Sequence, residues 1–168
     1  MTATRPEPEA VLRAAIAYNG SDVARIHHLI KVTGFADAIS HAEVDDADTR
    51  YTLTIAAILH DIGIHEAERK YGSSAGPYQE KEGPAVARAI LKPLGMPDAV
   101  TERVCWLIAH HHTMKPIGGI DHQILLEADF LVNAYEESMP HAAVEAFCRT
   151  VARTKTGTEM IRALYPAE

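Results

Sequence analysis

The sequence of 168 residues is poor in cysteine and in basic side chains. Its only cysteines, Cys105 and Cys148, each lie inside an apolar stretch. Two isolated thiols favour a reducing compartment over a disulfide framework, so we expect both to be free and buried. Lys and Arg number 16 against 23 Asp and Glu, which gives a formal net charge of −7. This balance argues against the positive surface that a nucleic-acid polymer needs as a partner.

Long apolar runs are also missing. A charged side chain interrupts each apolar stretch before it reaches the length that a transmembrane helix requires. Residues 1–9 are polar and contain prolines, unlike the apolar core of a signal peptide. We therefore expect no membrane association and a cytoplasmic location.

Signals for β-strands are equally scarce. No segment keeps an alternation of apolar and polar residues, and no Asn-Gly or Asp-Gly hairpin turn occurs. The length suits one domain, so we predict a single all-α domain over residues 1–168. Its helices are predicted over residues 8–19, about 22–40, about 49–63, 82–94, 98–111 and 122–137, with a helix from Pro140 and a last one capped by Thr156 and Glu159. A long connector is predicted between residues 64 and 81.

The most informative segment is residues 54–63, Thr-Ile-Ala-Ala-Ile-Leu-His-Asp-Ile-Gly, in which His60 and Asp61 follow an apolar run. Two neighbouring polar groups in a core are unfavourable unless each finds a partner. Neutral imidazole and carboxylate can both bind a divalent cation. A buried hydrogen bond between the two residues would also satisfy them, so the pair alone leaves both interpretations open.

Two further polar residues are predicted to face the core. His28 shares a helical stripe with the apolar residues Val32 and Ile39, and Asp129 lies beside Leu125 in an apolar helix. Taken singly, His28 could be a hydrogen-bonded core residue, and Asp129 could form a buried salt bridge or a helix cap. Glu127 and His122, on the same segment as Asp129, are predicted to face solvent.

Together these residues form a candidate metal-binding set of His28, His60, Asp61 and Asp129. Helix bundles build metal sites from side chains that converge on the core from different helices. Two nitrogen and two oxygen ligands with open positions suit Mn, Fe, Ni, Co or Mg better than a closed structural zinc site.

The order His28, His60-Asp61 and Asp129 resembles the motif of the HD-domain superfamily of metal-dependent phosphohydrolases. Residues 56–63 resemble the central motif of that family, and Glu127-Ala-Asp129 resembles its distal aspartate. The resemblance extends over residues 21–137 and implies a compact multi-helix bundle with a metal site in its core. It also implies metal-ligand roles for these four residues. Asp61 would in addition act in catalysis, by holding the attacking water and accepting its proton.

A second group of residues is predicted near this centre. Some members of the superfamily bind two metals, and His110 and His111 resemble the paired histidines of those members. Glu82 stands where such members have a histidine. We predict that these three residues bind a second metal or a substrate phosphate, with a histidine-rich helix end favoured by the helix dipole as the structural alternative. Arg25 and Lys115 are predicted to contact substrate phosphate.

Departures from the family motifs narrow the activity. Cyclic-dinucleotide phosphodiesterases have a lysine where this chain has Ile64, and their Gly-Tyr-Pro segment is absent. Some nucleotidases place a glutamate at that same position. His65 and Glu66 are therefore candidates for proton transfer, the alternative being that both lie in an exposed loop.

The resemblance implies hydrolysis of a phosphate ester or anhydride in a small molecule, with a nucleotide as the favoured substrate. A catalytically weak nucleotide-binding sensor or regulatory protein that retains the metal site is the alternative. A di-iron oxygenase, as in some distant relatives of the fold, would need more ligands than the sequence offers. The expected partner is a small phosphorylated molecule. The sequence is compatible with a homo-oligomer and does not fix the oligomeric state.

Overall fold

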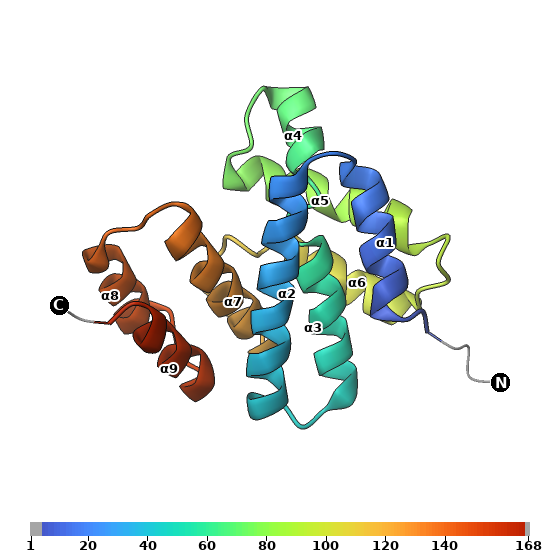
Figure 1. The fold of residues 1–168 in the computed structure, drawn as a ribbon. Coiled ribbons are helices and arrows are strands. Elements are labelled where there is room, and N and C mark those ends of the chain that lie inside the picture. The colour runs from blue at the N-terminus through green and yellow to red at the C-terminus, as the bar shows by residue number, and fades with distance from the viewer. Residues whose placement is uncertain (1–4, 167–168) are drawn as a thin grey trace.

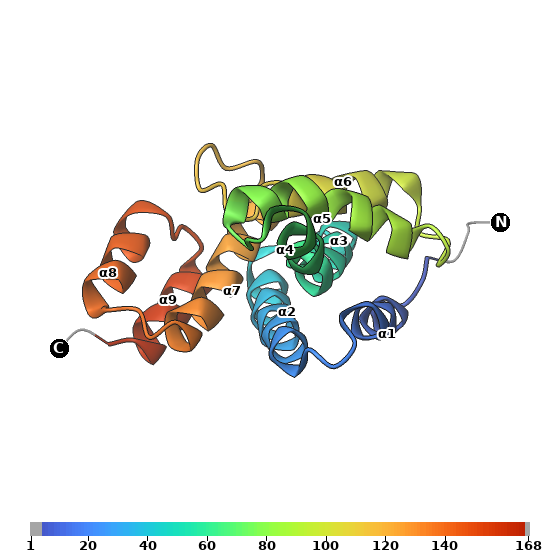
Figure 2. The same cartoon turned by 90° about the horizontal axis from the view of Figure 1, so that it is seen from above.

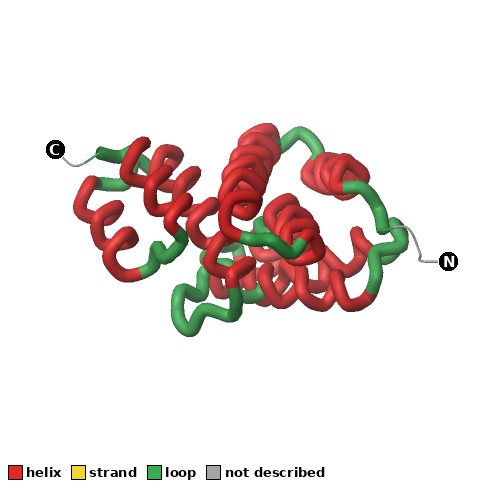
Figure 3. The backbone as a smooth tube through the Cα atoms, turned by 90° about the horizontal axis from the view of Figure 1, so that it is seen from below, coloured by secondary structure: helices red, strands yellow, loops and turns green. Residues whose placement is uncertain are grey.

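A computed structural model describes residues 5–166 of the chain (Figure 1). Within this range the chain forms nine helices and no strand, which confirms the all-α class (Figure 3). The helices are α1 (Pro8–Asn19), α2 (Val23–Glu43), α3 (Ala47–Leu59), α4 (Ile64–Tyr71), α5 (Gly76–Leu91), α6 (Asp98–Ile108), α7 (Ile120–Glu136), α8 (His141–Thr150) and α9 (Lys155–Leu164). None of the helices in this range has the length and apolar character needed to span a bilayer.

The core lies where α2 packs against α3 and α7. Helix α3 also packs against α6, and α5 packs against both α4 and α6. Viewed from above, α5 and α6 lie side by side, while α7 leads from the centre to α8 and α9 (Figure 2). Apolar faces at helical spacing meet in this core, whose largest fully buried side chains include Ile39, Leu53, Ile55, Leu107 and Leu125. Cys105 and Cys148 are both buried and free, as expected.

The predicted connector between residues 64 and 81 is wrong in part, because it contains α4 and the start of α5. In α4, Ile64 and Ala67 are buried three residues apart, which gives this short helix an apolar face. It ends at Gly72, whose φ of 63° is favourable for glycine. Helix α5 begins six residues earlier than predicted because Pro77 occupies its first turn, where proline is tolerated.

Two glycines allow three segments of the chain to pack closely, the first two through their backbones and the third through the side chain of Ile108. A Cβ atom on Gly63 would lie 2.6 Å from the backbone nitrogen of Gly83 and 2.8 Å from the carbonyl oxygen of Gln79. A Cβ atom on Gly83 would lie 2.5 Å from Cγ2 of Ile108. The segment that follows His60 therefore packs directly on α5, and α5 packs directly on the end of α6.

The prediction that Glu127 faces solvent is wrong, since its side chain is fully buried on α7. Its Oε1 accepts hydrogen bonds from the backbone nitrogens of Arg153 and Thr154 at 2.7 and 3.0 Å, and from the side chain of Gln123 at 2.7 Å. Its Oε2 accepts a bond from the Thr154 hydroxyl. Thr154 in turn caps α9 by accepting a bond from Gly157 N at 2.9 Å, so the cap lies two residues before the predicted Thr156.

Candidate metal centre

Three helices bring the four predicted ligands together. His28 lies on α2, His60 and Asp61 follow the last residue of α3, and Asp129 lies on α7. His28 Nε2 lies 3.2 Å from His60 Nε2 and 3.2 Å from Asp129 Oδ1. It also lies 3.3 Å from Asp61 Oδ2, while His60 Nε2 lies 3.5 Å from an oxygen of each aspartate. Because α2 packs between α3 and α7, the inward faces of the three helices meet at this point (Figure 1).

Hydrogen bonds fix which nitrogen of each histidine faces the centre. His28 Nδ1 donates to Glu136 Oε2 at 2.8 Å, and His60 Nδ1 donates to the carbonyl oxygen of Ala57 at 2.7 Å. In the neutral ring these acceptors keep the proton on Nδ1, so that the Nε2 lone pair is directed inward. Glu136 is itself held by Lys31 Nζ at 2.5 Å. Glu136 was not among the residues predicted from the sequence, although it lies two helical turns after Asp129 and therefore shares the same face of α7.

The donor atoms fit a divalent cation. Asp129 Oδ1 is buried without a hydrogen-bond partner, as is His111 Nε2, and a buried polar atom normally has one. Ligands about 2.1 Å from a common ion are about 3.0 Å apart at octahedral edges and about 3.4 Å apart at tetrahedral ones. The separations of 3.2–3.5 Å among His28, His60, Asp61 and Asp129 agree with these values.

The charges within the cluster shift the pKa values of its members. Burial alone would lower the pKa of His60, but the carboxylates of Asp61 and Asp129 outweigh it and raise that pKa to about 9. Burial also lowers the pKa of His28, but the carboxylates of Asp61 and Asp129 together outweigh it, so this pKa is raised as well. Burial would raise the pKa of each aspartate, but the neighbouring histidines hold both well below their usual range. Both carboxylates are therefore ionised at neutral pH, as metal ligands must be.

A second set of donor atoms shares Asp61. His111 Nε2 lies 3.3 Å from Asp61 Oδ1, and His111 Nδ1 donates to the carbonyl oxygen of Ile108 at 2.6 Å. His112 completes the set, with one donor atom of each residue within 4.8 Å of the others. Its Nε2 lies 3.3 Å from Gln79 Oε1. Asp61 thus lies between two groups of histidine nitrogens, an arrangement in which one carboxylate can serve two ions.

Two residues predicted for this second set lie elsewhere. His110 stacks on Trp106 with ring centroids 4.0 Å apart, and its Nδ1 bonds to the Trp106 carbonyl oxygen at 2.7 Å. Glu82 accepts hydrogen bonds from Lys70 at 2.6 Å and from the Tyr71 hydroxyl at 2.7 Å, and the charge of Lys70 neutralises its carboxylate. The prediction used a helix that reached residue 111, but α6 ends at Ile108. The turn that follows directs His111 into the core and leaves His112 beside it at the surface.

The prediction that His122 faces solvent is also wrong. Its side chain is fully buried, its Nδ1 accepts a bond from Gly118 N at 3.0 Å, and its Nε2 donates to the His110 carbonyl oxygen at 2.8 Å. Burial lowers the pKa of His122, so the ring is neutral and keeps both bonds. The ring therefore joins the turn after α6 to the start of α7.

Of the two cations predicted to contact phosphate, the structure brings only Arg25 to the centre. Arg25 lines a cavity of about 240 Å³ together with His28, Asp61 and Asp129. Lys115 is exposed in the connection between α6 and α7 and does not line that cavity.

The two candidates for proton transfer lie on α4 rather than in a loop. His65 Nε2 lies 3.3 Å from Asp22 Oδ2, and Glu66 is bound by Arg69 at 2.6 Å. Neither residue belongs to the two donor sets found in the described part of the chain.

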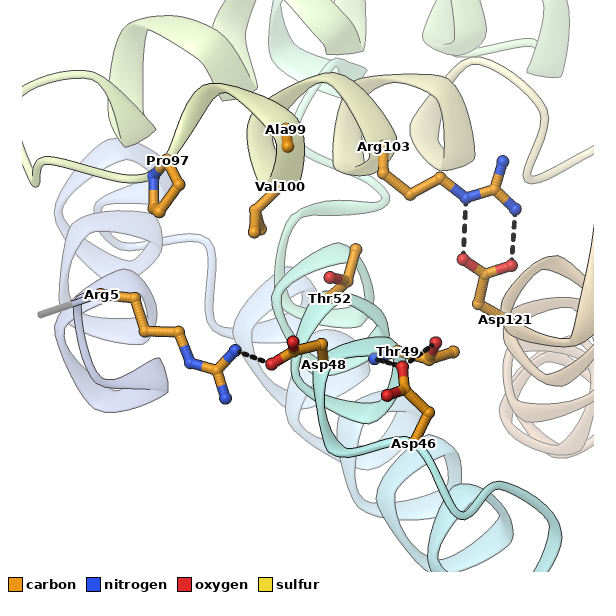
Figure 4. Close-up of a pocket in the computed structure, with 10 residues that line it drawn as sticks. All are labelled: Arg5, Asp46, Asp48, Thr49, Thr52, Pro97, Ala99, Val100, Arg103 and Asp121. Carbon is orange, nitrogen blue, oxygen red and sulfur yellow. Dashed lines mark hydrogen bonds and ion pairs between the residues drawn. The ribbon is translucent and has the colours of Figure 1, made fainter. Parts of the chain in front are cut away.

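A larger cavity of about 510 Å³ lies away from the ligands, between the start of α3 and α6 (Figure 4). Its charged side chains pair with one another: Arg5 bonds to Asp48, and Arg103 binds Asp121 through two bonds of 2.6 and 2.8 Å. Asp46 accepts bonds from Thr49. Because each of these charged side chains already has a partner within the protein, we assign no ligand to this cavity.

Comparison with known proteins identifies the family. A model of the HD domain matches residues 25–151 of the chain. The crystal structure of a predicted HD superfamily hydrolase from an uncultured Thermotogales bacterium aligns with a TM-score of 0.69. The two sequences are 25% identical, and the alignment covers 95% of this chain and 86% of that one. No match is found among curated proteins. The family model covers most of the chain and includes all four convergent ligands, and the chain therefore belongs to the HD-domain superfamily of metal-dependent phosphohydrolases.

Proposed function

We propose that the protein hydrolyses a phosphate ester or anhydride bond of a small molecule, with a nucleotide as the favoured substrate, and that His28, His60, Asp61 and Asp129 hold the divalent cation this requires. The observation that carries the proposal is the convergence of two imidazole nitrogens and two ionised carboxylates at distances of 3.2–3.5 Å. The cluster borders a solvent-accessible cavity through His28, Asp61 and Asp129, so a substrate can reach it.

A divalent cation in this site supplies Lewis acidity, because it lowers the pKa of water and offsets charge on phosphoryl oxygens. Asp61 stays ionised at neutral pH and can accept a hydrogen bond from the attacking water, which orients the water towards phosphorus. Because the pKa of Asp61 is held low, the residue is a weak proton acceptor, and orientation is its larger contribution. Arg25, at the edge of the cavity, is placed to bind a phosphoryl oxygen.

We further propose that Asp61, His111 and His112 hold a second divalent cation. The buried Nε2 atom of His111 has no hydrogen-bond partner, and a cation would bind its lone pair. Elemental analysis of protein dialysed against manganese should then give two ions per chain, and one ion per chain for His111→Ala. One ion per chain in both proteins would assign His111 and His112 to substrate phosphate instead.

The activity is tested by measuring phosphate release from a nucleoside monophosphate, a nucleoside triphosphate and 4-nitrophenyl phosphate, each with manganese, cobalt, nickel or magnesium. Asp61→Asn should lower kcat/KM by about a thousandfold, because it removes a charge shared by both donor sets. Asp37→Asn, which removes an exposed carboxylate on α2, is the matched control and should retain activity. An Asp61→Asn protein as active as the wild type would refute the proposal.

The same assay separates the sensor from the enzyme. Tight nucleotide binding with no product under any of the four metals would assign the protein to regulation. The experiment needs calorimetry on the metal-loaded protein beside the activity measurement, so that binding is measured independently of turnover.

A further inference from the structure

Two cavities adjoin the candidate metal centre. The first, here called the polar cavity, has a volume of about 240 Å³. Besides three of the candidate ligands, its lining includes Arg25, Gln79 and Glu136. The second, the apolar side pocket, has a volume of about 190 Å³. Both are lined by His112, Asp129, Asn133 and Glu137, so the two cavities meet beside the ligands.

The polar cavity carries few positive charges for a phosphate site. Among the described residues that line it, Arg25 is the one permanent cation, and Asp22 already lies 4.0 Å from it. Glu136 and Glu137 add two carboxylates at the cavity, of which Glu136 is neutralised by Lys31. Asp61 and Asp129 together balance one divalent cation, so the charge of a second cation is what remains to balance a single phosphate group of charge about −2. Further phosphate groups would meet the carboxylate of Glu137 with no additional cation.

The side pocket has the opposite character. Its polar residues lie where it meets the metal centre, and the remainder is apolar, formed by Met114, Leu126, Phe130, Met139 and Phe147. Phe130 and Phe147 stack with ring centroids 3.7 Å apart and an interplanar angle of 6°, so this wall of the pocket is aromatic. Aromatic and methionine side chains bind flat or apolar groups and offer no partner for a charge.

We infer that the substrate is a phosphate monoester with a single phosphate group, whose organic part is compact, uncharged and apolar or aromatic. The phosphate would occupy the polar cavity at the metal centre, and the organic part would occupy the apolar side pocket. This inference rests on the proposed function and narrows it, because it favours a nucleoside monophosphate or another monoester over a nucleoside triphosphate. In the reaction the water oxygen bonds to phosphorus and the bond from phosphorus to the ester oxygen breaks. One proton passes to the departing oxygen, which gives an alcohol and inorganic phosphate.

Two pairs of substrates test the two parts of the inference with the full chain and manganese. Benzyl phosphate and glycerol 1-phosphate are both esters of a primary alcohol, and they differ in the polarity of the organic part. Adenosine monophosphate and adenosine triphosphate differ in charge and share the organic part. In each pair we expect kcat/KM to be at least about tenfold higher for the first compound.

Exposed side chains provide variants that should fold. Met114→Asp places a charge at the side pocket and should reduce the preference for benzyl phosphate about tenfold, whereas Leu164→Asp, on exposed α9, should not. Glu137→Lys should reduce the preference for the monophosphate about tenfold, whereas Glu159→Lys makes the same charge change on α9 and should not alter it.

The outcomes separate this inference from the proposed function. Hydrolysis that depends on Asp61 but favours glycerol 1-phosphate, the triphosphate or a phosphodiester would overturn the inference and leave the phosphohydrolase intact. Variants at Met114 and Glu137 that behave like their controls would overturn the assigned pockets. Absence of phosphate release from every compound under every metal would overturn both.

Discussion

A metal ion in this site should compete with a proton on His60. The neighbouring carboxylates raise the pKa of His60 to about 9, so in metal-free protein its imidazole is protonated at neutral pH. Because Nδ1 is held by the carbonyl oxygen of Ala57, the competing proton sits on Nε2, which is the nitrogen that would bind the ion. Metal binding must release it. A change of pH therefore tests whether His60 binds the metal ion, and it requires no substitution.

The expected magnitude follows from the two pKa values. A rise from 6.5 in the unfolded chain to about 9 in the folded one corresponds to about 3 kcal/mol. Since the folded-state pKa is the higher one, this stabilisation of metal-free protein is complete below pH 6.5 and is lost as the pH rises through 9. Metal affinity changes in the opposite direction. At pH 7 only about 1% of His60 is neutral, and each pH unit up to 9 should raise the affinity about tenfold, or about 1.4 kcal/mol.

The assay is chemical denaturation at pH 6.5, 7.5 and 8.5, with EDTA or with a fixed manganese concentration. The stabilisation by manganese should grow with pH. Calorimetry in buffers of different ionisation enthalpy should detect at least about one proton released per ion at pH 7, since the pKa of His28 is raised as well. His41→Ala, which removes an exposed histidine on α2, is the control and should leave both results unchanged. Manganese affinity that is constant from pH 6.5 to 8.5 would refute the assignment of His60 as a ligand.

Three further substitutions test the packing that supports the site. Glu136→Ala should lower manganese affinity about 10- to 100-fold, as measured by calorimetry, because His28 loses the acceptor that orients its ring; unchanged affinity would contradict that role. Gly157→Ala should destabilise the protein by about 2–4 kcal/mol in urea unfolding, because the new methyl group would overlap Glu127 Oε2. Gly34→Ala, with nothing within 4 Å of its Cβ, should instead stabilise α2 by about 0.5–1 kcal/mol, and equal effects at the two glycines would show that the overlap is relieved.

The ligand set could be predicted because each member breaks a regular pattern. His28 and Asp129 are polar residues on otherwise apolar helical stripes, and His60 and Asp61 end an apolar run, so each position signals a buried polar group. Inward placement of the four side chains, of which Asp61 keeps some exposure, is a property of local sequence. Their convergence on one point is not a property of local sequence, and it could be expected only from the resemblance to a family.

The second donor set could not be derived in the same way, because it depends on where one helix ends. A continuous helix through residue 111 would direct His110 and His111 differently from the turn that follows Ile108. No glycine or proline marks that end. The turn is held by Trp106, which lies on α6 and stacks on His110, and by His122, which lies on α7 and bonds to the carbonyl oxygen of His110. Contacts between helices therefore contribute to where α6 ends and how the following histidines are directed, as they do to the burial of Glu127.

The contact between Gly63 and Gly83 bears on how the two candidate ion positions could vary among related sequences. Gly63 follows the His60-Asp61 pair, Gly83 lies on α5, and Ile108 immediately precedes the turn that carries His111 and His112. The spacing between the two donor sets is thus set by two close contacts, one between the backbones of Gly63 and Gly83 and one between the backbone of Gly83 and the side chain of Ile108. Substitution at either glycine would push the two sets apart. We expect evolution to exchange the ligands of the second set more readily than either glycine, so that loss of the second ion would leave this spacing intact.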